Sequence, residues 1–390
     1  MKSLRLILMA VLLTFVVSSV WGEKADKPRF HSSTYKMTAK IHLKNEYRMY
    51  DSAAAILEEG VQFFPEDAEM HFLLGKTYYY KQNYRGMAEQ FAMADSLKRE
   101  KDKWLEELSL MRDEKYPKIY NQGIDAYQGG DYETALDLFF TCSVLDPSDA
   151  RGFWLFGDTY RLKGEFEKAL SALDVALKLA PDDPGIWKSY GEVLFHTGRN
   201  KEALDAYDKV LQKKPDDSDV LFNVATIHYN AGDLDRAITA FQRLVELDSA
   251  YTNAYFNMGN AYLLQIGSID KALDSLKTES GEPAADAKST ARTEELNQKR
   301  TELLAGATAA FEKVTQLDTT DIEAHALLAE IYQQQDSLDK ALSILEALVQ
   351  KDSTNCRAWQ QLAFIYAKRN MGDEAKDAYQ KAQDCAKTKP

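Results

Sequence analysis

Residues 131–139 read DYETALDLF, and three later stretches repeat this pattern: EFEKALSAL at 165–173, RNKEALDAY at 199–207 and DLDRAITAF at 233–241. The central alanine of each stretch recurs every 34 residues, at Ala135, Ala169, Ala203 and Ala237. Ala341 and Ala375 have the same spacing. A fixed period in the range of about 20 to 50 residues indicates a chain built from stacked copies of one small unit.

Other small residues and prolines keep the same step. The small residues upstream are Gly123, Gly157, Gly191 and Ala225, and the prolines downstream are Pro147, Pro181 and Pro215. This small–small–proline pattern resembles the tetratricopeptide repeat, whose unit is a helix–turn–helix hairpin. In units starting at 116, 150, 184, 218, 252, 322 and 356, the eighth position is always Gly or Ala. A small residue is needed there because the two helices of a hairpin cross at close range.

The resemblance implies an all-α fold, a right-handed superhelical solenoid of about nine helix–turn–helix repeats with one polar insertion. The scarcity of glycine (19) and proline (9) in 390 residues also favours long helices. The interrupted unit runs from 252 to 322, one repeat plus 36 residues. We expect a second helix to start over 268–277, a polar loop to follow in TESGEPAADAKSTART, and residues 303–317 to resume the second helix.

The sequence predicts three segments: a signal peptide at 1–22, degenerate or capping repeats with a charged connector at 23–115, and the solenoid at 116–390. The insertion is placed at about 277–301. The connector, KREKDKWLEELSLMRDEK at 98–115, shifts the repeat phase by 14 residues. It is expected to be either a charged helical connection or a lengthened helix.

The first 22 residues have the layout of a secretory signal peptide. Lys2 and Arg5 precede an apolar run at 6–17, and small residues lead up to an expected cut before Glu23. The alternative is an uncleaved membrane anchor, and we expect membrane association only in that case. Cleavage would change the formal charge from −13 to −15, because two basic residues are lost. The predicted location is the periplasm or cell envelope, or outside the cell.

Composition and motifs argue against several classes of function. The chain has 61 acidic and 48 basic residues, whereas binding to nucleic acid requires a basic surface. The sequence contains no P-loop, no G-x-G-x-x-G and no G-x-S-x-G motif, and its six histidines have no metal-binding spacing. His71, His228 and His325 occupy packing positions of the repeat. We therefore expect a non-enzymatic protein without a cofactor or metal.

The three cysteines are too few for a disulfide scaffold. Cys142 occupies a packing position and is expected to be a buried thiol. Cys356 and Cys385 are positions one and thirty of the last repeat, so both lie at the same end of an antiparallel hairpin. An exported protein meets an oxidising compartment, so these two cysteines are a candidate disulfide.

The resemblance implies that the first helices of the hairpins line a concave groove, which such repeats present to a partner. The candidate groove residues are Tyr120, Asn121, Trp154, Lys188, Phe222, Asn223, Tyr229, Asn230, Phe256, Asn257 and Asn260. Asn223 and Asn257 share the sixth position, which resembles an asparagine ladder that holds a peptide backbone, because a carboxamide both donates and accepts. The carboxylate clamp of chaperone-binding members is not matched. Lys188 takes a clamp-like place, but Glu192 stands where asparagine is expected.

The leading hypothesis is a non-enzymatic protein–protein interaction scaffold of the cell envelope, which binds a peptide or protein partner in this groove. The alternative is a structural subunit of an envelope machine for secretion, polysaccharide export or outer-membrane assembly. Such a subunit would dock through its convex face or its insertion. An enzyme with an unfamiliar site is a third class, and only turnover of a substrate would support it.

Overall fold

The computed structural model describes residues 27–44, 46–279 and 287–388. Within these ranges the chain forms eighteen α-helices and no β-strand. The predicted signal peptide, residues 1–22, lies outside the described residues. The chain divides into two compact units, one ending at Pro181 and the other beginning at Asp182.

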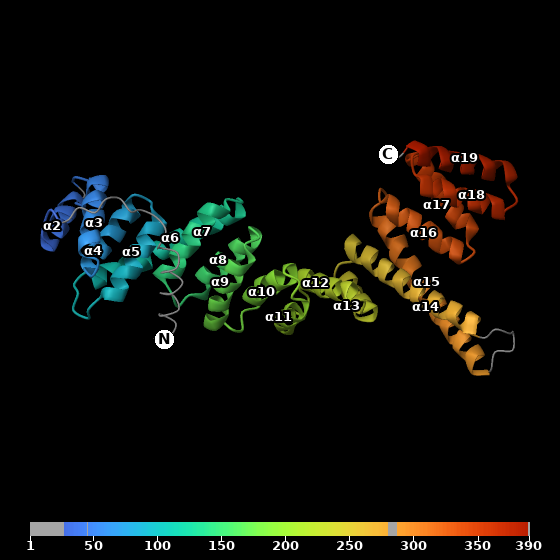
Figure 1. Cartoon of the computed structure of the whole chain (residues 1–390), viewed down its shortest axis with the longest axis horizontal. Coiled ribbons are helices and arrows are strands. Elements are labelled where there is room, and N and C mark those ends of the chain that lie inside the picture. Colours follow the sequence, from blue (N-terminus) through green and yellow to red (C-terminus); the bar gives the residue numbers. More distant parts are fainter. Residues whose placement is uncertain (1–26, 45, 280–286, 389–390) are drawn as a thin grey trace. The chain divides into compact units, whose positions relative to one another are not determined.

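Unit 1 is a stack of four antiparallel helical hairpins, coloured blue to green in Figure 1. Its helices are α2 (Ser32–His42), α3 (Tyr50–Phe63), α4 (Ala68–Tyr80), α5 (Tyr84–Leu97), α6 (Leu105–Gln128), α7 (Tyr132–Leu145), α8 (Ala150–Leu162) and α9 (Phe166–Leu179). The helices of each hairpin pack on one another, α3 packs equally on α4 of the next hairpin, and α5 and α8 also pack on α7.

Unit 2 contains five further hairpins, so the described residues hold the nine that the sequence predicted. Its helices are α10 (Pro184–His196), α11 (Asn200–Lys213), α12 (Ser218–Asn230), α13 (Leu234–Leu247), α14 (Thr252–Glu279), α15 (Ala287–Leu317), α16 (Ile322–Gln334), α17 (Leu338–Lys351), α18 (Cys356–Lys368) and α19 (Gly372–Thr388). The all-α hairpin architecture is thus confirmed, and the handedness of the superhelix stays a prediction.

Aspartates at the end of one repeat start the first helix of the next. The carboxylate of Asp183 accepts hydrogen bonds from the backbone N–H groups of Gly185 and Ile186, and Asp217 accepts one from Val220. These bonds satisfy N–H groups that have no partner within a helix. In the pairs Asp182-Asp183 and Asp216-Asp217, it is therefore the second residue that caps the helix.

The turn inside a hairpin requires a left-handed residue at position fifteen. Positive φ angles occur there at Gln82, Gly130, Gly164, Gly198, Gly232, Asp336 and Asn370, with values between 55° and 78°. Glycine adopts this conformation at no steric cost, and Asn and Asp tolerate it. The interrupted repeat has Ile266 at this position. A β-branched residue disfavours positive φ, and α14 continues through Ile266 without a turn.

The insertion differs from the prediction because it extends both helices of one hairpin. No new helix begins at Ser268, since α14 is unbroken from Thr252 to Glu279. The expected polar loop is partly helical, because α15 starts at Ala287, while residues 280–286 lie outside the described part. The added turns bury the apolar side chains of Ile266, Ile269, Leu273 and Leu296, which belong to the same core as the hairpins that follow. Figure 1 shows this long hairpin reaching past its neighbours in unit 2.

Glycines mark the points where the helices of a hairpin cross. A Cβ atom added at Gly191 would lie 2.7 Å from the ring of Tyr207, and one added at Gly259 would lie 2.6 Å from the ring of Phe311. The second contact spans the insertion. It shows that residues 303–317 resume the second helix of the interrupted repeat, as their sequence predicted.

Part of the charged connector lengthens a helix, since residues 105–115 are the first turns of α6, while residues 98–104 are not helical. Helix α6 runs from Leu105 to Gln128, so it passes through the boundary that the sequence placed between residues 115 and 116. Leu108 is buried, Glu107 forms an ion pair with Lys76 of α4, and the ammonium group of Lys115 lies 5.1 Å from the centre of the Tyr79 ring. These contacts fix the added turns of α6 against α4.

Candidate partner-binding surface

The eleven candidate groove residues are divided between the two units. Tyr120, Asn121 and Trp154 lie on α6 and α8 of unit 1. The other eight lie on α10, α12 and α14 of unit 2, which are the first helices of successive hairpins. We therefore treat the faces of these three helices, referred to below as the inner face of unit 2, as one candidate surface.

In unit 1 the ring of the candidate residue Tyr120 is partly covered by its neighbours. Tyr120 stacks on Tyr116 at a centroid distance of 6.0 Å, and the guanidinium of Arg151 lies 5.2 Å from its ring centre. Nearby, the buried carboxylate of Asp158 accepts hydrogen bonds from Tyr127 and Arg161. Burial and this hydrogen bond raise the pKa of Tyr127. Several polar side chains of α6 and α8 are therefore already hydrogen bonded or ion-paired within unit 1.

Lys188 does not offer a free positive charge. Its ammonium group lies 2.9 Å from Asp217 Oδ1 and 2.7 Å from Asp219 Oδ2. Partial burial lowers the pKa of Lys188, but the two carboxylates outweigh this effect and leave the pKa raised. Because the lysine is neutralised by its own chain, a carboxylate clamp at this place has no support.

Asn223 is engaged within its own unit. Its carboxamide nitrogen donates a hydrogen bond to the hydroxyl oxygen of Tyr207, on helix α11, at 3.1 Å. The ladder inferred from Asn223 and Asn257 therefore loses one of its two free donors. In the described part of unit 2, the side chains of Asn230, Asn257 and Asn260 have no hydrogen-bond partner, and each is at least partly exposed. These carboxamides remain available to a partner.

Aromatic side chains form the base of the inner face. Phe222 packs against Phe241 and Tyr251 at centroid distances of 6.0 and 5.7 Å, and Phe256 meets Phe311 edge-on at 5.7 Å. Both Phe222 and Phe256 are half-buried. Phe222 and Tyr229 pack against one core, and Phe256 packs against the core of the following hairpins. Part of each ring thus stabilises the fold, and Phe256 and Asn260, four residues apart on α14, share one side of that helix.

Two glutamines on α16 and α18 are not among the candidates that the sequence predicted. Among the described residues, Gln333 Nε2 and Gln361 Oε1 are buried and have no hydrogen-bond partner. Gln361 Nε2 donates to Glu330 at 2.7 Å, so only its oxygen is unused. Beside them on α18, Phe364 is 57% exposed. Gln361 takes the sixth position of its repeat, as Asn223 and Asn257 do, so the position itself was a usable signal.

The repeat geometry explains the unused nitrogen of Gln333. In unit 1, position twelve of one repeat and position nine of the next hold Tyr127 and Asp158, which are hydrogen bonded. The same positions in α16 and α18 hold Gln333 and Phe364. A phenyl ring offers no oxygen to accept the hydrogen bond, so the buried Gln333 nitrogen has no partner at this place.

Surface hollows occur elsewhere, in unit 1. One of about 410 Å³ lies between α4 and α6, where Tyr79, Tyr80, Leu110 and Met111 are among its lining residues. A wider one of about 820 Å³ is lined mainly by charged side chains and by Phe63, Phe64 and Trp104. Neither hollow includes a candidate groove residue.

The described residues contain no group of three or more side chains able to hold a metal ion. His71 is buried, and its ring nitrogens pair with Gln90 and with the carbonyl of Pro65, as a packing position requires. No helix in the described ranges is long and apolar enough to cross a membrane.

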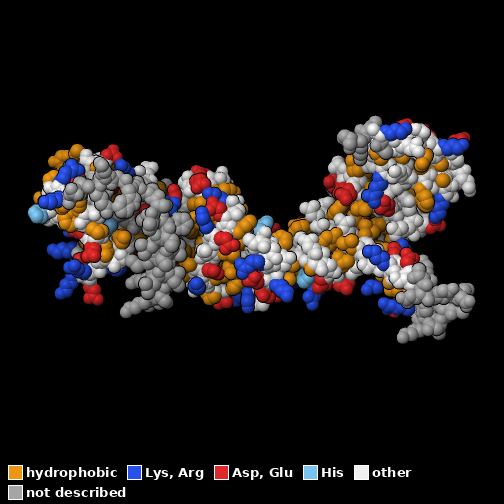
Figure 2. Space-filling model, in the orientation of Figure 1, with side chains coloured by type: hydrophobic (Ala, Val, Ile, Leu, Met, Phe, Trp, Pro, Cys, Tyr) orange, Lys and Arg blue, Asp and Glu red, His pale blue; other side chains and the backbone are white. Residues whose placement is uncertain are grey.

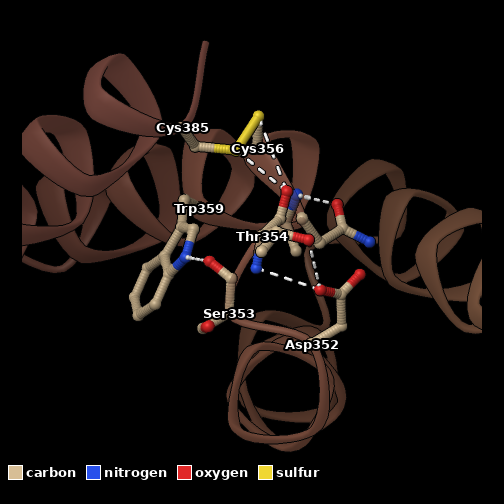
Figure 3. Close-up of a disulfide and its surroundings, with 8 residues drawn as sticks. Asp352, Ser353, Thr354, Cys356, Trp359 and Cys385 are labelled. Atoms are coloured by element: carbon tan, nitrogen blue, oxygen red, sulfur yellow. Dashed lines mark hydrogen bonds between the residues drawn. A yellow bond between two sulfur atoms is a disulfide. The ribbon is translucent and has the colours of Figure 1, made fainter. Parts of the chain in front are cut away.

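Cys356 and Cys385 are joined by a disulfide, with Cα atoms 5.4 Å apart (Figure 3). Cys356 is the first residue of α18, and Cys385 lies near the end of α19, so the bond closes the open end of the last hairpin. Trp359 Nε1 donates to the carbonyl of Ser353 at 3.0 Å and holds the preceding turn. Cys142 is buried and free, and burial raises the pKa of its thiol to about 12.

Three family models match parts of the chain. A model described as the cytochrome c-type biogenesis protein H TPR domain matches residues 144–252, and two models described as tetratricopeptide repeat match residues 223–285 and 302–362. No curated protein matches the chain.

Several solved structures are similar to the chain at low identity. The C-terminal part of a TPR repeat-containing protein from Cytophaga hutchinsonii has a TM-score of 0.52 at 13% identity, over 69% of this chain and 96% of its own. The pilF protein of Pseudomonas aeruginosa gives 0.45 at 16% identity, over 63% and 96%. YrrB, described as a TPR protein with an unusual peptide-binding site, gives 0.42 at 21% identity, over 59% and 97%.

The 34-residue period, the hairpin pairing and the glycine crossings agree with the three family matches. The chain is a tetratricopeptide repeat protein.

Proposed function

We propose that the protein is a non-enzymatic interaction scaffold of the cell envelope that binds an extended protein segment on the inner face of unit 2. The observation that carries this proposal is the set of unused carboxamides on the first helices of that unit, among them Asn257 and Asn260. The envelope location rests on the sequence of the first 22 residues alone.

The chemistry of the inner face suits a peptide backbone. A carboxamide can donate to a backbone carbonyl and accept from a backbone N–H, without selecting a side chain. The partly exposed rings of Phe222 and Phe256 add apolar contact area, and they are already held in place by the core. An extended strand would therefore gain hydrogen bonds and buried area from a surface that needs little reordering.

A library of random twelve-residue peptides displayed on phage would test this proposal. Selected peptides should bind the wild-type protein, and Asn257→Ala combined with Asn260→Ala should weaken them about thirtyfold, since two hydrogen bonds contribute about 2 kcal/mol. Asn297→Ala, which changes an exposed asparagine of α15, is the matched control and should leave the Kd within about twofold. Selected peptides that bind both variants equally would show that the inner face is not the site.

The alternative of a machine subunit is favoured by one observation, the long α14–α15 hairpin, whose added turns are helical and bury apolar side chains. A variant lacking residues 266–301 and carrying Glu302→Gly restores both the 34-residue step and glycine at position fifteen. If a partner that co-purifies with the wild-type chain is lost from this variant but kept by the asparagine double variant, the hairpin is the docking element. If the partner is kept by the deletion variant but lost from the asparagine double variant, it binds to the inner face.

A further inference from the structure

The N-terminal end of unit 1 exposes an unusual number of large apolar side chains. Five of the fifteen large exposed hydrophobic residues in the described ranges fall within residues 30–49: Phe30 (49%), Met37 (62%), Ile41 (46%), Tyr47 (55%) and Met49 (45%). The terminal units of a solenoid normally present a polar outer face. This end departs from that rule, so its apolar side chains need a function.

These side chains lie around a single helix. Met37 and Ile41 are one turn apart on the exposed side of α2, whose opposite side buries Tyr35 and Ala39. The loop after α2 returns to it, because the backbone N–H of Met49 donates to the carbonyl of His42 at 3.1 Å. Hydrophobic side chains are visible on this part of the surface in Figure 2.

The same segment is basic in an acidic chain. Residues 27–49 contain six basic residues and one acidic residue, whereas the whole chain has a formal charge of −13. Arg29, Lys36 and Lys40 form ion pairs with acidic residues of α3 and α4 or of the turn between them. The side chains of Lys27, Lys44 and Arg48 form no ion pair with any described residue.

We propose that this end of unit 1, formed by residues 27–44 and 46–49, docks on the surface of a membrane that contains anionic phospholipid. A helix that combines exposed apolar side chains with lysine and arginine lies in the interface plane of such a membrane. The apolar side chains enter the headgroup region, and the unpaired cations meet phosphate groups.

Charge and position in the sequence favour a lipid surface over a second copy of the chain. A two-fold contact between copies of the chain would set the same basic residues against each other, which is unfavourable. The apolar run at 6–17 also ends only nine residues before Lys27, so this end lies next in sequence to a membrane-directed segment.

Methionine oxidation supplies a local test in the full chain. Hydrogen peroxide oxidises exposed methionines, and mass spectrometry measures each site separately. On phosphatidylglycerol vesicles, the oxidation rates of Met37 and Met49 should fall at least about fivefold, because lipid covers their sulfur atoms. Met93 of α5, which is 42% exposed in the same unit, is the internal control and should not change. On phosphatidylcholine vesicles, protection should be absent.

Charge variants complete the experiment. Lys44→Glu with Arg48→Glu should abolish the protection of Met37, while Lys271→Glu with Lys299→Glu, at exposed sites in unit 2, should preserve it. Equal protection on both kinds of vesicle, or none on either, would overturn the proposal. Protection that appears without lipid and grows with protein concentration would overturn it too, in favour of a second copy as the occupant.

Discussion

Two glycines of α14 should respond in opposite ways to the same substitution. At Gly259 an added Cβ would lie 2.6, 2.7 and 3.0 Å from three ring carbons of Phe311, whose side chain is fully buried. Carbon atoms in contact prefer about 3.5–4.0 Å, so the ring must retreat by about 1 Å. At Gly267 no atom lies within 4 Å of the added Cβ.

The expected magnitudes follow from these distances. Overpacking a core costs about 1–3 kcal/mol, and replacing a helical glycine by alanine gains about 0.5–1 kcal/mol. Gly259→Ala should therefore destabilise unit 2 by about 1–2 kcal/mol, while Gly267→Ala should stabilise it by about 0.5–1 kcal/mol. Equilibrium urea denaturation followed by circular dichroism gives the free energy of unfolding, and amide exchange in α14 and α15 locates the change.

A third variant tests whether the Phe311 ring causes the effect of Gly259→Ala. By itself, Phe311→Leu should lower the free energy of unfolding. In the double variant with Gly259→Ala, the loss should be smaller than the sum of the two single losses, because the smaller side chain leaves room for the new Cβ. If Gly259→Ala and Gly267→Ala stabilise the protein equally, the two helices do not cross at Gly259, and the assignment of the resumed repeat after the insertion is wrong.

Three further predictions concern the disulfide, the Asp67 carboxylate and the buried Cys142 thiol. Reducing the Cys356–Cys385 bond, which closes a loop of 29 residues, should lower the local stability of the last hairpin by about 3.5 kcal/mol, measured as faster amide exchange in α19; unchanged exchange contradicts this. Partial burial raises the pKa of Asp67, but its contacts with Ser32 and Lys36 lower it more. Its contribution to stability should thus be present above pH about 3.8 and fade as the pH falls further, and Asp67→Asn should flatten that acid limb of the unfolding curve. Cys142, whose pKa is raised to about 12, should react with a thiol reagent at pH 8 only after unfolding; a fast reaction in the native protein would disprove its burial.

The repeat phase could be predicted because it depends on short-range geometry. Gly123, Gly191 and Gly259 recur where two helices cross, and each meets a ring of its own hairpin partner. Such contacts lie within one repeat, so the sequence pattern reports them directly. The same repeat pattern predicted that residues 303–317 belong to the second helix after the insertion, and α15 includes them.

The insertion was harder to predict because its outcome depends on one residue. The polar composition after Lys277 suggested a loop, but the decisive feature is Ile266 at the position that is left-handed in other repeats. Once α14 continues, Ile269 and Leu273 can pack on α15 and make the extension helical. The apolar residues of the extension can be seen in the sequence, but the sequence does not show which helix they pack against.

The candidate surface shows where sequence positions stop being informative. Asn223 and Asn257 are equivalent in the repeat, yet Asn223 donates to Tyr207 while Asn257 is unpaired among the described residues. Lys188 takes a clamp-like place in its repeat, but Asp217 and Asp219 neutralise it. Equivalent positions have the same direction in each repeat, but their neighbours on the adjacent helices differ.

The sequence by itself determined the helical repeat, its period, the number of hairpins and the residue pair that closes the last one. These features follow from contacts within one hairpin or between consecutive residues, which recur at fixed spacing. The tertiary structure decided which polar groups remain free, how α14 and α15 extend the insertion, and that the N-terminal end leaves Met37 and Ile41 exposed. Those features depend on contacts between helices, where a hydrogen-bond partner or a covering side chain is either present or absent.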